Sequence, residues 1–101
     1  MKVVFRLRTP LSPNSGIELD FSNKVFKNRR FKYGTSEVIP TKHWNQRTMR
    51  ANIGKSSGSL YQSLINTNRK LDSLEIKLLN YMRKYPATTA KNLKEHLEDE
   101  T

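Results

Sequence analysis

Residues 60–82, LYQSLINTNRKLDSLEIKLLNYM, carry the apolar pattern that decides the fold. Apolar residues return every three or four positions, a spacing that places them on one face of an α-helix. The stripe consists of Leu60, Leu64, Thr67, Leu71, Leu74, Leu78 and Tyr81 or Met82. Ser57 or Ser59 is expected to cap the start of this helix. Pro86 should end it at Tyr85, because the residue before a proline disfavours helical geometry. The result is a helix of about 25 residues, roughly 37 Å long.

A second, shorter helix is expected after Pro86. Thr88 or Thr89 would cap its start, because both can accept a hydrogen bond from the first helical turn. Leu93 and Leu97 lie four residues apart and would face inward.

The first third of the chain alternates apolar and polar residues with a period of two, which predicts three β-strands. The apolar positions are Val3, Phe5 and Leu7, then Ile17, Leu19 and Phe21, then Phe31 and Tyr33. A loop over 9–16, TPLSPNSG, separates the first two strands. Three strands joined in chain order predict an antiparallel meander.

The ends of the second and third strands are less regular. Val25 and Phe26 either extend the second strand or follow a bulge. Lys27-Asn28 suits a two-residue hairpin turn, because asparagine tolerates positive φ. Gly34 and Pro40 are expected to bound the far end of the third strand.

We therefore expect an α+β fold, with a three-stranded antiparallel β-sheet packed on one long C-terminal α-helix that a short helix follows. Residues 1–58 would form the basic sheet and a connector, and 59–85 the long helix of the same domain. Residues 86–101 would form the short helix or a linker. The connector over 41–58 is polar, and its single tryptophan, Trp44, is expected to pin it to the core.

The charge is large and unevenly distributed. Nineteen lysines and arginines against nine acidic residues give a net charge of +10. Residues 1–58 hold twelve basic and three acidic side chains, whereas 59–101 hold seven and six. An excess of one sign in one half of a chain predicts a positive surface and an anionic partner.

If the long helix covers the apolar face of the sheet, the opposite face is left open and basic. Arg6, Arg8, Arg30 and Lys32 would project from it beside Glu18 and Asp20 of the middle strand. These four cations are our candidates for contacts in a DNA groove. The candidates for phosphate contacts are Lys24, Lys27, Arg29, Lys42, Arg47 and Lys55, and Arg50 also lies in the basic connector. Glu18 and Asp20 would weaken the field or hold Arg6 and Arg8 in fixed rotamers.

The sequence gives little indication of a catalytic site or a cofactor-binding site. His43 and His96 lie in different segments without metal-ligand spacing, and there are no cysteines. NIGKSSG (52–58) lacks the leading glycine of a phosphate-binding loop at the right spacing. We expect no enzyme active site, metal or cofactor within these residues. Since no apolar run approaches about 20 residues, we also expect no membrane span.

Residues 29–45, RRFKYGTSEVIPTKHWN, carry a resemblance to a known family. Two basic residues begin this segment, and aromatic and basic residues then alternate. A break of small residues follows, and then a turn of the form hydrophobic-Pro-x-x-x-Trp-Asn. This order resembles the N-terminal arm-DNA-binding domain of Bacteroidetes-type tyrosine recombinases, the integrases of phages and transposons. KVVFRLR (2–8) is similar to the first strand of that domain. ATTAKNLKEHL (87–97) is similar to the segment before its core-binding domain.

The resemblance implies a function and a location. Such a domain binds arm-type duplex DNA sites through the major groove and tethers the recombinase. Its partners would be double-stranded DNA and the other domains and subunits of the integrase, in the cytoplasm of a bacterium and at its nucleoid. The isolated domain is expected to be monomeric. The catalytic domain would lie further along the parent protein, so none of the tyrosines here is its nucleophile. Glu18 and Asp20 depart from the neutral or basic outward residues usual in the middle strand.

Two alternatives remain at this point. A binder of single strands or RNA would use Phe31 and Tyr33 as stacking platforms, which requires exposed rings. A protein-interaction module would instead dock a neighbouring integrase subunit or an acidic partner on the sheet edge or the long helix.

Overall fold

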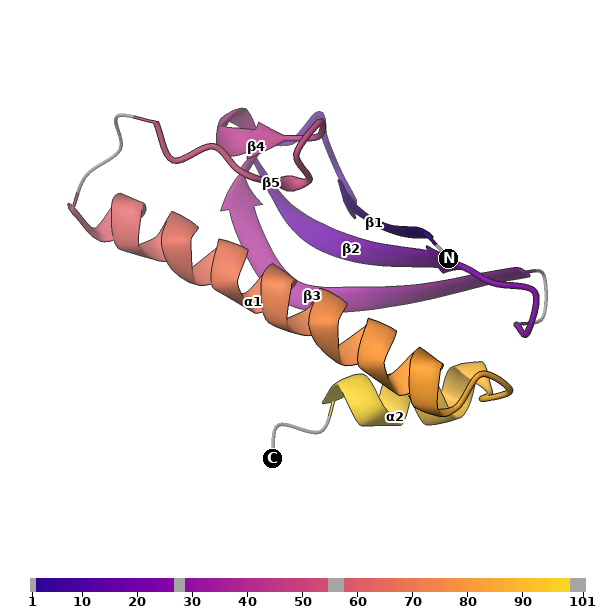
Figure 1. Cartoon of the computed structure of the whole chain (residues 1–101). Coiled ribbons are helices and arrows are strands. Elements are labelled where there is room, and N and C mark those ends of the chain that lie inside the picture. Colours follow the sequence, from indigo (N-terminus) through magenta and orange to yellow (C-terminus); the bar gives the residue numbers. More distant parts are fainter. Residues whose placement is uncertain (1, 27–28, 55–57, 99–101) are drawn as a thin grey trace.

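The structure, a computed structural model, describes residues 2–26, 29–54 and 58–98. It has a three-stranded antiparallel sheet in the order β1-β2-β3 and a separate two-stranded ribbon, β4-β5. The strands are β1 (Lys2–Leu7), β2 (Asn14–Ser22), β3 (Arg30–Pro40), β4 (Trp44–Asn45) and β5 (Arg50–Ala51), and the helices are α1 (Gly58–Lys84) and α2 (Ala90–Glu98). The expected α+β architecture is confirmed (Figure 1).

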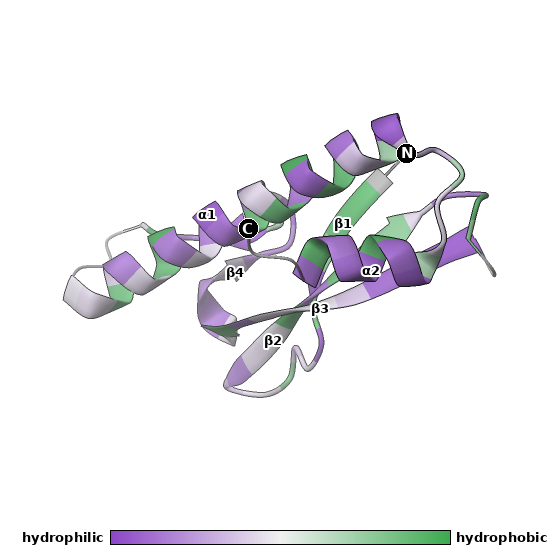
Figure 2. Cartoon of the chain, turned by 90° about the horizontal axis from the view of Figure 1, so that it is seen from below, coloured by the Kyte–Doolittle hydropathy of each residue, from purple (hydrophilic) through white to green (hydrophobic). Residues whose placement is uncertain are grey.

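Both α-helices lie on one side of the three-stranded sheet. Figure 1 shows α1 crossing beneath the sheet and α2 beside the C-terminal half of α1. Seen from below, hydrophilic and hydrophobic residues alternate along α1 and α2 (Figure 2). The opposite side of the sheet is covered by neither helix.

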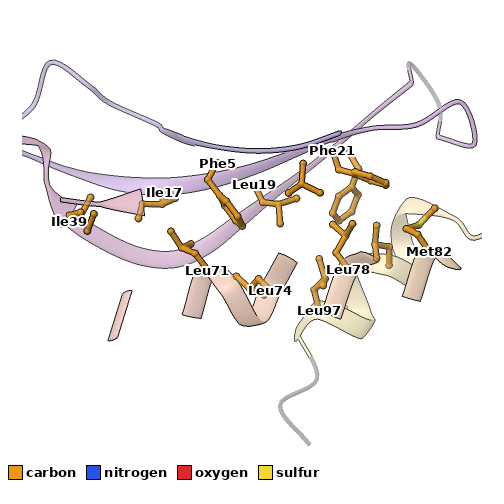
Figure 3. Close-up of a cluster of buried hydrophobic side chains, with 14 of the residues drawn as sticks. Phe5, Ile17, Leu19, Phe21, Ile39, Leu71, Leu74, Leu78, Met82 and Leu97 are labelled. Atoms are coloured by element: carbon orange, nitrogen blue, oxygen red, sulfur yellow. The ribbon is translucent and has the colours of Figure 1, made fainter. Parts of the chain in front are cut away.

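The core lies between the sheet and the two helices (Figure 3). The sheet contributes Val3, Phe5, Ile17, Leu19, Phe21 and Phe31, and the helices contribute Leu64, Leu71, Leu74, Leu78, Met82, Leu93 and Leu97, all of them buried. The predicted inward faces are therefore confirmed for most positions. Leu60 is an exception, because it lies in the first turn of α1 and remains exposed.

The helix ends follow their predicted signals in part. α1 ends at Lys84, directly before Tyr85-Pro86. The hydroxyl of Thr89 accepts a hydrogen bond from the backbone N–H of Asn92 at 3.2 Å, so Thr89 caps α2. The capping role expected of Ser59 is wrong because Ser59 is already helical, and Ser57 lies outside the described residues.

The third strand passes Gly34, the first of its two expected boundaries, but ends at the second, Pro40. It continues through Gly34 to Pro40, past an irregularity in pairing where Gly16 faces Val38 and Glu18 faces Gly34. Inside this bulge the hydroxyl of Thr35 donates to the backbone oxygen of Ile17 at 2.8 Å. The bond gives the backbone oxygen of Ile17 a partner at the position where β2 has no register pair on β3.

Two further expectations about the strands are wrong. The loop ends earlier than 9–16 implies, because β2 already begins at Asn14. Val25 and Phe26 do not extend β2. Phe26 instead folds back into the core, where its ring centroid lies 5.9 Å from that of Phe21 and 5.5 Å from that of Phe31. The predicted turn at Lys27-Asn28 falls outside the described residues.

The basic connector has its own structure, which the sequence did not indicate. A 3-10 turn over Thr41–His43 leads into the β4-β5 ribbon. The Trp44 ring packs half-buried against the core, as expected. Its Nε1–H donates to the Gln46 side chain at 2.9 Å, and Gln46 in turn donates to the backbone oxygen of Phe5 at 2.8 Å. The ribbon is thereby tied to the free edge of β1.

Candidate nucleic-acid interface

The outer face is the side of the three-stranded sheet turned away from α1. Among the side chains that the structure describes, six charged ones belong to it: Arg6, Arg8, Glu18, Asp20, Arg30 and Lys32. The strand register explains their grouping, because Val4, Asp20 and Lys32 face one another across the three strands and Arg6 faces Glu18. Side chains at alternate positions of paired strands project on the same side, so the period of two places all six together as predicted.

Asp20 lies at the centre of the outer face and links its two neighbouring strands. Its Oδ2 atom accepts hydrogen bonds from Arg6 Nη2 at 2.5 Å and from Arg30 Nη2 at 2.7 Å. The Asp20 side chain is 3% exposed, whereas those of Arg6 and Arg30 are 43% and 52% exposed. The expected ion pairing across the strands is present, because Asp20 pairs with Arg6 and Glu18 lies beside Arg8. The sequence did not indicate that Asp20 also binds Arg30.

The Arg8 side chain lies over two glycines, where no other side chain is in its way. A Cβ atom added to Gly16 would lie 3.3 Å from Arg8 Cδ, and one added to Gly34 would lie 3.7 Å from Arg8 Nη1. The Arg8 side chain therefore runs across β2 towards β3 over these two glycines. Its Nε lies 3.9 Å from a Glu18 carboxylate oxygen, and the side chain is 60% exposed. Arg8 is thus the most exposed arginine of the outer face.

The candidate phosphate contacts lie around the ends of the sheet. Lys24 and Arg29 are exposed in the segment between β2 and β3. Lys42, in the 3-10 turn, and Arg47, between β4 and β5, are exposed near the other end. Lys27 and Lys55 fall outside the described residues.

The two aromatic residues of β3 point towards the helices. Phe31 is 4% exposed, and Tyr33 packs half-buried against the core. Their rings stack on each other with centroids 6.5 Å apart. A base cannot reach a buried ring face, so this arrangement does not offer the stacking platform that a single-strand binder needs.

Arg50 of the connector has a structural role. Its guanidinium donates to Asp72 and Glu75 of α1, both at 2.9 Å, and lies 5.0 Å from the centroid of the Phe5 ring. Asn68 of α1 binds both backbone groups of Ala51, at 2.7 and 3.1 Å. Together these contacts hold β5 against α1. Arg50 is therefore engaged in the fold and is not among the cations available to bind a ligand.

Replacing Arg50 with glutamine should lower the free energy of unfolding by about 1–3 kcal/mol, because two charge-assisted hydrogen bonds and a cation–π contact are lost. Affinity for DNA should change less than in an Arg47→Gln control, since Arg47 is exposed. Chemical denaturation and titration with duplex DNA measure the two effects. A larger loss of affinity in Arg50→Gln than in Arg47→Gln would contradict the structural role.

Over residues 2–26, 29–54 and 58–98, no cluster of three or more histidine, aspartate or glutamate side chains could hold a metal ion. None of the helices there combines the length and apolar character needed to cross a membrane. Comparison with protein-family models, curated proteins and solved structures found no match to this chain.

Proposed function

We propose that this chain is the DNA-binding module of a site-specific integrase, which binds arm-type duplex sites through the outer face of its sheet and tethers the recombinase there. One observation carries the proposal. Four cations, Arg6, Arg8, Arg30 and Lys32, project side by side from a sheet face that neither α1 nor α2 covers. The proposal names an integrase because residues 29–45 resemble recombinase arm-binding domains.

The dimensions of the outer face suit a major groove. Three strands spaced about 4.8 Å apart measure about 10 Å between the outer two. The major groove of B-DNA is about 12 Å wide and admits β-structure. Arg8 and Arg30 would reach base edges, because the arginine fork matches the O6 and N7 atoms of guanine. Lys24, Arg29, Lys42 and Arg47 would contact phosphates, which set the position of the protein without determining sequence.

The proposal accommodates the two acidic residues of β2. Asp20 and Glu18 lower the net charge of the outer face, but they also restrict the arginines beside them. Arginines held in place lose less conformational entropy on binding. A module of this kind acts on bacterial DNA in the cytoplasm, together with the other domains and subunits of its integrase.

Affinity for duplex DNA should fall steeply with salt. If roughly six phosphates are neutralised, the logarithm of the association constant should change with the logarithm of salt concentration at a slope near −5. Fluorescence anisotropy with a labelled duplex from about 50 to 200 mM salt measures this slope. A slope near zero, or no binding to any duplex, would refute the proposed function.

A further inference from the structure

The carboxylate of Asp20 is buried beneath two arginines that belong to different strands. Arg6 on β1 and Arg30 on β3 share one of its oxygens, Oδ2. An ionised carboxylate with 3% exposure is costly unless a cation pairs with it. At least one of the two arginines must therefore stay with Asp20 when the outer face meets a ligand.

The two arginines are not equivalent in this arrangement. Among the described residues, the buried side-chain polar atoms that lack a hydrogen-bond partner are Arg6 Nε and Asp20 Oδ1. Both belong to the same ion pair. Arginine commonly binds a carboxylate with two parallel N–H···O bonds, and a rotation of the Arg6 guanidinium that joined Nε–H to Oδ1 would satisfy both atoms.

Arg30 is the more exposed of the two arginines, with 52% of its side chain accessible against 43% for Arg6. Asp20 would gain a second bond from Arg6 if Arg30 left. Loss of Arg6 would instead leave the buried carboxylate with the more exposed partner alone.

We propose that Asp20 is a positioning residue that retains Arg6 as its permanent counter-ion and presents Arg30 to a guanine edge of duplex DNA. When Arg30 exchanges Asp20 for the base, Arg6 closes onto both carboxylate oxygens. This inference rests on the proposed function. It divides the four predicted groove contacts, because Arg6 becomes a positioning residue while Arg30 determines sequence preference.

The test compares Asp20→Asn with a matched control, Glu18→Gln. Each variant removes one negative charge from the same strand and the same face. The probes are a duplex selected from a random pool by the unmodified chain and a scrambled duplex of equal length. Both variants should bind the scrambled duplex more tightly, because the net positive charge rises.

The preference for the selected duplex should separate the two variants. Asp20→Asn should reduce the ratio of selected to scrambled affinity by about 5- to 140-fold, the range expected for one bidentate arginine–guanine contact. Glu18→Gln should leave this ratio nearly unchanged. If the two variants keep the same ratio, Asp20 acts only through its charge, and the inference is overturned while the proposed function stands.

Thermal unfolding without DNA tests the asymmetry between the arginines. Arg6→Ala should lower Tm by about 5 °C or more, Arg6→Lys should recover part of that loss, and Arg30→Ala should shift Tm by less than about 2 °C. Equal shifts for Arg6→Ala and Arg30→Ala would overturn the permanent pairing of Arg6. If the unmodified chain bound no duplex at all, both the proposed function and the role of Arg30 would fall.

Discussion

Replacing Phe31 with alanine should lower the free energy of unfolding by about 3–5 kcal/mol. Phe31 is 4% exposed, and its ring lies between those of Phe26 and Tyr33. Truncation would leave a cavity at the centre of an aromatic row that joins β3 to the segment after β2. A domain of this size has a total stability of the same order, so the variant should be largely unfolded at 37 °C.

Lys32→Ala is the matched control for this prediction. Lys32 is the next residue of β3, but it is exposed and projects from the outer face. Its replacement should change stability by less than about 0.5 kcal/mol. Chemical denaturation followed by circular dichroism compares the two variants. If Phe31→Ala folded normally but no longer bound nucleic acid, the ring would be a binding group and the single-strand alternative would gain support.

The main layers of this fold can be predicted from periodicity because each layer has one buried face. The period of two in β1 and β2 and the stripe of α1 place most core residues correctly, with Leu60 as the exception. The period also assigns Phe31 to the core and Arg30 to the outer face. The grouping of the six outer-face charges follows from the same alternation, without knowledge of the strand register.

The parts that sequence did not predict depend on contacts between residues far apart in the chain. Gly34 predicts the end of a strand, but β3 continues past it, and just beyond it the Thr35 hydroxyl binds the backbone oxygen of Ile17. In the sequence Arg50 cannot be distinguished from the other cations of the connector. Its ion pairs with Asp72 and Glu75 form only when β5 lies against α1. The role of Asn68 is equally hidden, since a polar residue in a helix gives no sign that it binds a strand backbone.

The binding of Asp20 by two arginines has a partial signal in the positions of these residues along the strands. Arg6 lies two residues from Val4 on β1, and Arg30 lies two residues from Lys32 on β3, where Val4 and Lys32 are the direct partners of Asp20. Such diagonal neighbours are within reach of long side chains. Sequence alone leaves the register open by one or two residues, and each choice would pair Asp20 with different cations.

Reversing the charge of the two outer-face cations that Asp20 does not hold should abolish specific DNA binding. Replacing both Arg8 and Lys32 with glutamate should weaken affinity for a duplex by more than about 100-fold at 100 mM salt, because two groove contacts are lost and two repulsive charges gained. The salt slope should also become shallower, because the positive charge of the outer face falls. Both residues are exposed, so the fold should be retained.

The control reverses two exposed cations of α1, Lys70 and Arg83, which changes the net charge by the same amount. Since α1 lies on the opposite side of the sheet, this double variant should lose affinity only through the reduced overall field, by less than about tenfold. Anisotropy titrations of both variants against one duplex provide the comparison. A greater loss from the α1 variant would mean that the helical side of the molecule faces the DNA. The arginines of the outer face would then only stabilise the sheet through their ion pairs.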